Sequence, residues 1–283
     1  MRRATAVLAL VALVAAPACS KGEGAPRPTV AASFFPLAEV ARAVAGRDAD
    51  VIDLTPPGQD PHGLTELTAT AIAGADVLVH LGRGFQPAVD ELAASFEGKV
   101  VDGLEALPVV DDDVHVWLDP TMLGKIATAV ADALSEADPD HAEAYASNVQ
   151  RYLVQLSNLD RRLVAGLSTC ARNIIVSAHA AWRYFTSRYR LEQEPLAGVS
   201  PGEPPAPGRA EELVALVRDA GVTTVFREPL VPDGPISALA ATTGARIATL
   251  DPLEGRVDTG PGGTYIELMG RNLSALRSAL GCR

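Results

Sequence analysis

Apolar runs alternate with amphipathic stretches along most of the chain. Continuous apolar runs, such as residues 76–81, are typical of buried parallel strands. Stretches with apolar residues at every third or fourth position, such as 211–220, are typical of amphipathic helices. Strands that alternate with helices in this way predict parallel sheets covered by helices on both faces, an α/β fold. The predicted strands are 29–33, 49–54, 76–81, 100–102, 172–177, 223–226 and 246–250, and the predicted helices are 37–44, 65–73, 86–95, 180–189, 211–220, 236–243 and 265–280.

A long helical pattern divides this alternation in two. From residue 139 to 167 the apolar positions recur at steps of three and four residues, and after Pro139 only Gly166 interrupts them. About 28 residues at about 1.5 Å each make a helix of roughly 40 Å. This is either a long surface helix of one domain or a rigid connector, and the α/β alternation that restarts behind it favours the connector. We therefore predict two Rossmann-like α/β lobes, at 29–137 and 168–283, joined by a long rigid α-helix at 138–167.

The first residues have the pattern of an export signal. Two arginines precede an uncharged apolar run, and Ala16-Pro17-Ala18 is a small-residue cleavage site before Cys19. We expect a signal peptide at 1–18 and a polar tether at 19–28, with Cys19 lipidated as in a bacterial lipoprotein. The alternative is cleavage at the same bond by ordinary signal peptidase. Both predict an exported protein, in the periplasm or on the outer face of the cytoplasmic membrane.

The net charge and the cysteines of the chain limit its expected binding partners and its expected cellular compartment. The formal net charge is −11, so nucleic acid is not an expected partner, and we expect contact with the membrane through a lipid anchor only. Besides Cys19 the chain has Cys170 and Cys282. In an oxidising compartment this pair predicts a disulfide, and the alternative is two unrelated buried thiols.

Four side chains with the chemistry of metal ligands follow predicted strands. In open α/β sheets, ligands bind at the carboxyl ends of the strands, so we expect these four to meet in the cleft between the lobes. Their spacing alone is not a compact metal-binding motif. They are His62, His115, His179 and Asp251.

The stretch around His115 has its own pattern. Apolar residues alternate there, which predicts an extended segment with His115 and Trp117 on the same face. Asp119-Pro120 follows and predicts the start of a helix, with the aspartate as N-cap and the proline in the first turn.

Four stretches together resemble a known family. They are Asp60-Pro61-His62, Val114-His115-Val116-Trp117-Leu118-Asp119-Pro120, residues 179–185, and Leu250-Asp251-Pro252-Leu253. They are similar in order and interval to the signature stretches of the metal-ion solute-binding proteins of bacterial ABC importers, the zinc and manganese group of ZnuA/TroA type. The resemblance covers about residues 29–280, including the long helix, and implies one metal ligand from each stretch: His62, His115, His179 and Asp251.

The chain departs from the family pattern at three places. Val114 stands where proline is usual, and Gln86 stands where a glutamate is common. Aspartates at 111–113 occupy the place of the histidine-rich loop that many zinc members carry. These aspartates are candidates for weak metal collection.

The implied ligand set favours zinc. Three imidazoles and one carboxylate suit tetrahedral Zn²⁺. The manganese branch of the family puts glutamate at the third position, so His179 favours zinc over manganese. Four protein ligands close the coordination shell, whereas a catalytic zinc keeps a water, so we do not expect an enzyme.

The resemblance implies an extracytoplasmic protein that captures Zn²⁺ between two lobes and passes it to the permease of an ABC importer. We expect a monomer. Three alternatives stay open. They are a manganese or broad divalent-metal carrier, a zinc-dependent hydrolase with an open coordination position and a general base, and a surface adhesin, which the resemblance permits.

Other candidates have secondary roles. Glu228 follows a predicted strand and either orients a ligand histidine with its carboxylate or forms a surface ion pair with Arg227. His80 lies within a buried strand and is expected in the core, whereas His141 is expected on the surface. Two aromatic residues are expected to pack beneath the site: Trp117 and Trp182.

Overall fold

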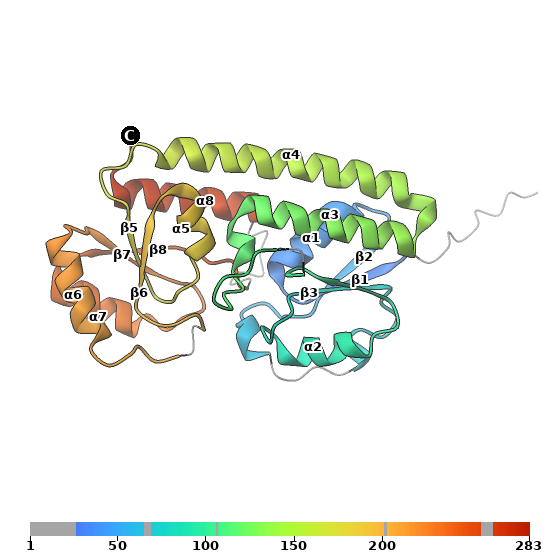
Figure 1. Cartoon of the computed structure of the whole chain (residues 1–283), viewed down its shortest axis with the longest axis horizontal. Coiled ribbons are helices and arrows are strands. Elements are labelled where there is room, and N and C mark those ends of the chain that lie inside the picture. Colours follow the sequence, from blue (N-terminus) through green and yellow to red (C-terminus); the bar gives the residue numbers. More distant parts are fainter. Residues whose placement is uncertain (1–26, 65–68, 106, 201–202, 256–262) are drawn as a thin grey trace, which may run out of the picture.

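Two four-stranded sheets, in which every strand pair is parallel, form the frame of the computed structural model, which describes residues 27–64, 69–105, 107–200, 203–255 and 263–283 (Figure 1). The first sheet has the order β2-β1-β3-β4 and the second β6-β5-β7-β8, so both sheets repeat one arrangement. In each sheet the chain moves first to one side and then to the other. This places a topological switch point, the usual ligand-binding place of such sheets, between β1 and β3 and between β5 and β7. The strands are β1 (Thr29–Ala32), β2 (Asp50–Asp53), β3 (Val77–His80), β4 (Lys99–Asp102), β5 (Ile174–Ser177), β6 (Glu192–Pro195), β7 (Thr224–Arg227) and β8 (Arg246–Thr249).

Helices cover both faces of each sheet. Successive side chains of a strand point to opposite faces, so neighbouring residues of one strand pack against different helices. In β5, Ile175 belongs to the core that both lobes share, whereas its neighbour Val176 packs in a separate cluster with apolar residues of α6 and α7. The helices are α1 (Phe35–Ala45), α2 (Pro87–Ala94), α3 (Pro120–Ala137), α4 (Ala142–Leu167), α5 (Arg183–Tyr189), α6 (Arg209–Asp219), α7 (Gly234–Thr243) and α8 (Tyr265–Leu280).

The predicted long connector is α4, which has 26 residues. It lies along both lobes in Figure 1 and packs against α1 and α3 of the first lobe and α8 of the second. One apolar core runs from the first lobe through the buried face of α4 into the second. The two lobes therefore share a core, which favours small relative movements over a wide hinge opening. The buried apolar residues of α4 are Tyr145, Val149, Tyr152, Leu156, Leu159, Leu163 and Leu167.

Most predicted elements are present within a few residues, but one strand was missed and the expected extended segment at His115 was wrong. The strand β6 was missed because its sequence, Glu-Gln-Glu-Pro, is polar; it lies at the edge of its sheet. The predicted helix at 65–73 lies partly outside the described residues, and its described part holds the 3-10 helix Ala69–Ala71. The segment after His115 is not extended but forms the 3-10 helix Val116–Leu118. The predicted cap of the next helix is confirmed, because the Asp119 side chain accepts the Thr121 N–H at 2.8 Å.

Several expectations concern residues outside the described ones. The predicted signal peptide, Cys19 and most of the tether lie within residues 1–26. Among the residues that the structure describes, no helix is both long and apolar enough to cross a membrane. The lobe boundaries at 29–137, 138–167 and 168–283 stay predictions.

The predicted disulfide between Cys170 and Cys282 is confirmed. Their Cα atoms lie 3.8 Å apart, and the bond joins positions 112 residues apart. Cys170 comes just after α4 and Cys282 just after α8. The bond therefore ties the end of the connector, at the entry to the second lobe, to the end of the last helix.

Removing this disulfide is expected to lower the free energy of unfolding by about 4 kcal/mol, because the bond restricts the unfolded chain over a long loop. Urea unfolding of the Cys170→Ser/Cys282→Ser double variant against the wild type measures the change. Intact mass after alkylation without reductant is the control. Two labelled thiols in the wild type would show that the bond does not form in solution.

Candidate metal centre

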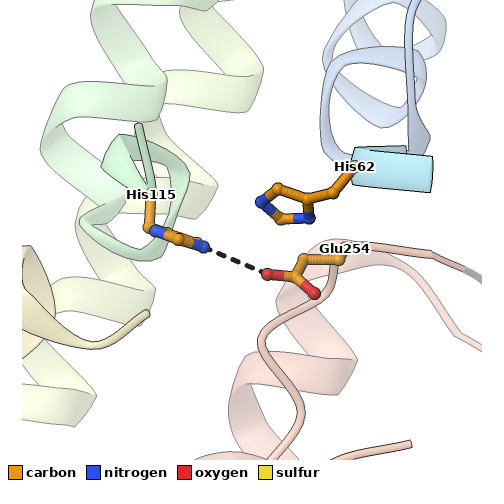
Figure 2. Close-up of side chains that lie close together, drawn as sticks. All are labelled: His62, His115 and Glu254. Carbon is orange, nitrogen blue, oxygen red and sulfur yellow. Dashed lines mark hydrogen bonds and ion pairs between the residues drawn. The ribbon is translucent and has the colours of Figure 1, made fainter. Parts of the chain in front are cut away.

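His62, His115 and Glu254 converge from separate loops of the two lobes (Figure 2). His62 lies in the 3-10 helix Pro61–Gly63 that follows β2, and His115 directly precedes the 3-10 helix at 116–118. Glu254 lies in the loop after β8. One potential metal-binding atom of each of these three side chains lies within 4.8 Å of those of the other two. The group therefore combines two lobes in one site.

His179 joins this group from the carboxyl end of β5. Its Nε2 lies 3.4 Å from Nε2 of His115 and 3.0 Å from Oε1 of Glu254. The same glutamate oxygen lies 3.1 Å from Nε2 of His115. These three side chains are at most 2% exposed. We refer to His62, His115, His179 and Glu254 together as the histidine–glutamate centre.

Two of the histidines are held by an aspartate two positions earlier in the sequence. Oδ1 of Asp60 lies 3.0 Å from Nδ1 of His62, and Oδ1 of Asp113 lies 2.7 Å from Nδ1 of His115. Each aspartate oxygen also accepts the backbone N–H of its histidine, at 2.9 and 3.0 Å. This local turn fixes the backbone and the ring together, because a short aspartate side chain reaches the N–H two residues on. The ring then presents Nε2 to the centre.

The third histidine is held by a residue distant in sequence. Glu228, directly after β7, contacts Nδ1 of His179 with its carboxylate and accepts the His179 N–H at 3.3 Å. Glu228 is 2% exposed, and Arg227 pairs instead with Asp233 at 2.8 Å. The alternative of a surface ion pair between Glu228 and Arg227 is therefore wrong. His179 and Glu228 follow β5 and β7, the two strands at the switch point of the second sheet.

The carboxylates control the protonation of the centre. Burial alone would lower the pKa of His179, but the charges of Glu254 and Glu228 outweigh it and raise this pKa to about 10. The pKa of His115 is also raised, because Asp113 and Glu254 outweigh the effect of burial. Burial alone would raise the pKa of Glu254, but His179 and His115 hold it well below its usual value. Nε2 of both rings faces the same oxygen of Glu254, at 3.1 and 3.0 Å, so the carboxylate favours the protonated form of both rings when no metal is bound.

The donor set of the centre suits a transition-metal ion. Nδ1 of each ring already faces a carboxylate, which leaves the three Nε2 atoms for the ion. Nε2 of His62 is buried and has no hydrogen-bond partner within the described part of the chain. Three imidazole nitrogens and one carboxylate oxygen form the type of shell that zinc adopts.

Comparison with known proteins agrees with this geometry. The model of one protein family, described as zinc-uptake complex component A, periplasmic, matches residues 30–279. The chain belongs to the ZnuA family. The match covers both lobes and all four residues of the histidine–glutamate centre.

Curated relatives of this ZnuA-family chain carry zinc-related names. It is 28% identical to the zinc-binding lipoprotein AdcA of Streptococcus pneumoniae over 98% of its own length, but it spans only 61% of that protein. It is 24% identical to the high-affinity zinc uptake system protein ZnuA of Bacillus subtilis, over 89% of this chain and 87% of that protein.

Solved structures have the same architecture. The zinc-bound ZnuA-like domain of Streptococcus pneumoniae AdcA is 29% identical and superposes with a TM-score of 0.78, covering 90% of this chain and 99% of that domain. The laminin-binding protein Lmb of Streptococcus agalactiae, described as a bifunctional adhesin and metal transporter, is 26% identical with a TM-score of 0.83, covering 89% and 99%. These similarities agree with the predicted two-lobe fold.

Asp251, the predicted fourth ligand, is not among the side chains that the structure of this ZnuA-family chain brings together. Its Oδ1 accepts the Leu253 N–H at 2.8 Å, and its backbone exchanges two hydrogen bonds with Asn272. Leu253 has a left-handed conformation, with φ of 60°. The resulting turn carries Glu254 into the centre. Burial raises the pKa of Asp251 to about 6.

The roles of three carboxylates, Glu254 in the centre and Asp60 and Asp113 behind its histidines, were missed in the sequence. Asp60 and Asp113 had a readable signal, because each stands two residues before a candidate histidine. Glu254 stands three residues after Asp251, so the same loop offers two carboxylates. Only the turn at Leu253 decides which one enters the centre.

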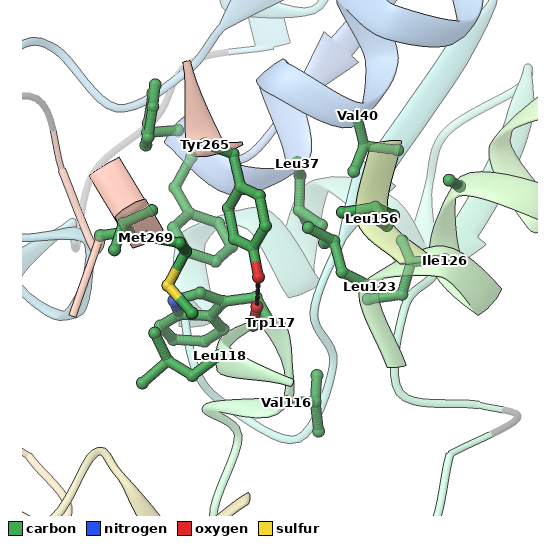
Figure 3. Packing of buried hydrophobic residues seen from close by; sticks show 14 of the residues in the cluster. Leu37, Val40, Val116, Trp117, Leu118, Leu123, Ile126, Leu156, Tyr265 and Met269 are labelled. Atoms are coloured by element: carbon green, nitrogen blue, oxygen red, sulfur yellow. Dashed lines mark hydrogen bonds between the residues drawn. The ribbon is translucent and has the colours of Figure 1, made fainter. Parts of the chain in front are cut away.

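An aromatic floor supports the centre, as predicted for Trp117. The Trp117 ring lies 5.0 Å from the His115 ring, and its Nε1 donates to the Pro252 carbonyl at 2.7 Å. Tyr265 of α8 donates its hydroxyl to the Trp117 carbonyl at 2.7 Å (Figure 3). Trp117 thus joins the His115 loop of one lobe to the Glu254 loop of the other. Because this floor is apolar and buried, it strengthens the electrostatic interactions above it.

The remaining candidates make contacts of their own. His80 is 6% exposed and contacts Asp90 through Nδ1 at 3.0 Å. His141 is half exposed on its side chain and contacts Asp138 at 2.7 Å. Trp182 is buried and packs edge-on against Phe185.

Proposed function

We propose that this chain is the zinc-binding component of an ABC importer, in which Nε2 of three histidines and the carboxylate of Glu254 hold Zn²⁺ as cargo. The observation that supports it is the convergence of these four groups, two from each lobe, with a carboxylate behind each ring. Such carboxylate–histidine pairs are typical of metal ligands. The names of the relatives agree with this cargo. In this proposal Glu254 takes the place predicted for Asp251.

Charge balance gives a further argument for a divalent cation. Nε2 of His115 and Nε2 of His179 both face Oε1 of Glu254, and this carboxylate favours a proton on each of them when no metal is bound. One Zn²⁺ in place of these two protons leaves the total charge of the buried centre unchanged. A buried site that exchanges protons for metal in this way avoids an uncompensated charge in either state.

The closed shell separates a carrier from an enzyme. A catalytic zinc keeps a coordination position for water, whereas here four protein groups surround the ion. We therefore propose a binding protein and not a hydrolase.

Export, a lipid anchor at Cys19, a monomeric state and delivery to a membrane permease complete the proposal. The shared core of the two lobes favours release through a small local displacement when the permease docks. Nucleic acid has no place in this function, because the chain is acidic.

Metal analysis and titration test the proposal. Protein stripped with a chelator and dialysed is expected to take up one Zn²⁺ per chain in competition with a chromophoric chelator. His115→Ala is expected to abolish this uptake. Absence of stoichiometric zinc binding by the wild type would overturn the proposal, and equal affinity for manganese would change the cargo to a broader class of divalent ions.

Replacing His179 by glutamate is expected to narrow the preference for zinc over manganese by about tenfold, or about 1.4 kcal/mol, because an oxygen replaces a nitrogen ligand. Competition titrations of wild type and His179→Glu with both metals measure the ratio. His141→Glu is a matched control, since His141 lies on the surface. An unchanged ratio in His179→Glu would mean that His179 does not bind the metal.

A further inference from the structure

The loop that precedes His115 is held by α5 of the other lobe. The Val110 N–H donates to the Tyr184 hydroxyl at 3.1 Å, and that hydroxyl donates to the Asp113 carbonyl at 2.7 Å. The Arg183 guanidinium lies 3.0 Å from the Asp111 carboxylate and 3.5 Å from the Asp113 carboxylate. Two adjacent side chains of the second lobe thus contact both ends of a four-residue loop of the first.

One backbone hydrogen bond closes this loop from within: the Asp113 N–H donates to the Val110 carbonyl at 3.0 Å. Asp111 and Asp112 both have left-handed backbones, with φ of 49° and 55°, which residues other than glycine rarely adopt. The side chain of Asp112 is 93% exposed and has a single ion pair, with Arg83 at 3.8 Å. The contacts from α5 therefore add to a turn that one backbone hydrogen bond closes, and they join this turn to the second lobe.

Asp113 connects these contacts to the metal centre. Its carboxylate is 1% exposed on the side chain; one oxygen faces Nδ1 of His115 and the other faces Arg183. A displaced Asp113 would free the His115 ring to rotate and take Nε2 away from the centre. The chain of contacts runs from α5 through Asp113 to the ring.

We propose that Arg183 and Tyr184 are positioning residues for metal binding: they hold Asp113, and through it His115, only while the two lobes stay in contact. This inference rests on the proposed zinc-binding function. Metal retention then depends on the contacts between α5 and the 110–113 loop. A partner that moves α5 away from this loop loosens one metal ligand without opening the whole molecule. Of the three aspartates at 111–113, Asp113 carries the effect to His115.

The helix α5 contains its own matched controls. Tyr189 and Arg188 repeat the tyrosine–arginine pair five residues on, but they contact Asp160 of α4, with the Tyr189 hydroxyl at 2.9 Å and Arg188 at 2.7 Å. Tyr184→Phe and Arg183→Gln remove contacts to the loop. Tyr189→Phe and Arg188→Gln remove contacts of the same kind from the same helix without touching the loop.

The zinc dissociation rate and the visible spectrum of the Co²⁺-loaded protein are the two readouts. Tyr184→Phe and Arg183→Gln are expected to release zinc about tenfold faster than wild type, as for other residues that orient a metal ligand. Their Co²⁺ absorption is expected to weaken as His115 leaves the shell. The two control variants are expected to stay within about twofold of wild type, and Arg183→Lys is expected to restore part of the loss.

The outcomes separate this inference from the function on which it rests. If the wild type binds zinc and the Tyr184 and Arg183 variants behave like their controls, the inference is wrong and the function stands. Faster release with an unchanged Co²⁺ spectrum would also overturn it, because His115 would then not have moved. If the wild type binds no zinc, the function itself fails. Asp111→Asn, which removes only the exposed contact of Arg183, is expected to leave the rate within about twofold of wild type.

Discussion

Glu254→Gln is expected to weaken zinc binding by at least about 100-fold, whereas Asp251→Asn is expected to weaken it by less than about tenfold. The Glu254 carboxylate lies within 3.1 Å of Nε2 of both His115 and His179. Its replacement removes a charged ligand from a buried site, and breaking a buried charge pair costs about 3–5 kcal/mol. Asparagine at 251 keeps an oxygen that accepts the Leu253 N–H, so the turn that carries Glu254 stays in place.

Competition titrations with a chromophoric chelator measure both affinities under identical conditions. Thermal unfolding of the metal-free variants shows whether either substitution disturbs the fold instead of the centre. A larger loss of affinity in Asp251→Asn than in Glu254→Gln would return the fourth ligand to Asp251, as the family resemblance implied.

Periodicity predicted the frame of the molecule because burial imposes it on the sequence. The apolar residues at 77–79 and 174–176 follow one another since both faces of a parallel strand are covered. The apolar periodicity of α4 is visible in the sequence because one face of the helix packs against the shared core. The edge strand β6 lacks this constraint and is polar, and it was missed for that reason.

The site was predictable to the level of loops but not of every side chain. The three histidines were predicted as ligands because they follow predicted strands, and the carboxyl ends of parallel strands face the ligand. The choice between Asp251 and Glu254 depends on a left-handed turn at Leu253, a residue type that gives no signal for such a backbone. The contact of Glu228 with His179 joins two separate strand ends, and only the sheet order makes β5 and β7 neighbours.

The second large expected effect is a dependence of zinc binding on pH. Both ring nitrogens of His115 and His179 face carboxylate oxygens, which favours the doubly protonated form of each ring when no metal is bound. The raised pKa values of both histidines agree with this geometry. Zinc must replace one proton on each ring.

Zinc affinity is therefore expected to fall by at least about tenfold for each pH unit of acidification near neutrality, because a proton on His179 competes with the metal and the raised pKa of His115 adds to this competition. The stability of the metal-free protein has the opposite trend. The folded-state pKa of His179, about 10, lies above the unfolded value of 6.5, so its contribution is complete below pH 6.5 and is lost as the pH rises through about 10. The unfolding temperatures of zinc-loaded and chelator-treated protein should thus diverge between pH 6 and 9, with zinc adding RT ln(1 + [Zn]/Kd) to the stability. His141→Gln, a change at a surface histidine, is expected to leave both trends unchanged. Affinity that does not vary with pH would show that zinc binding displaces no protons and that Glu254 does not hold the two rings as imidazolium ions.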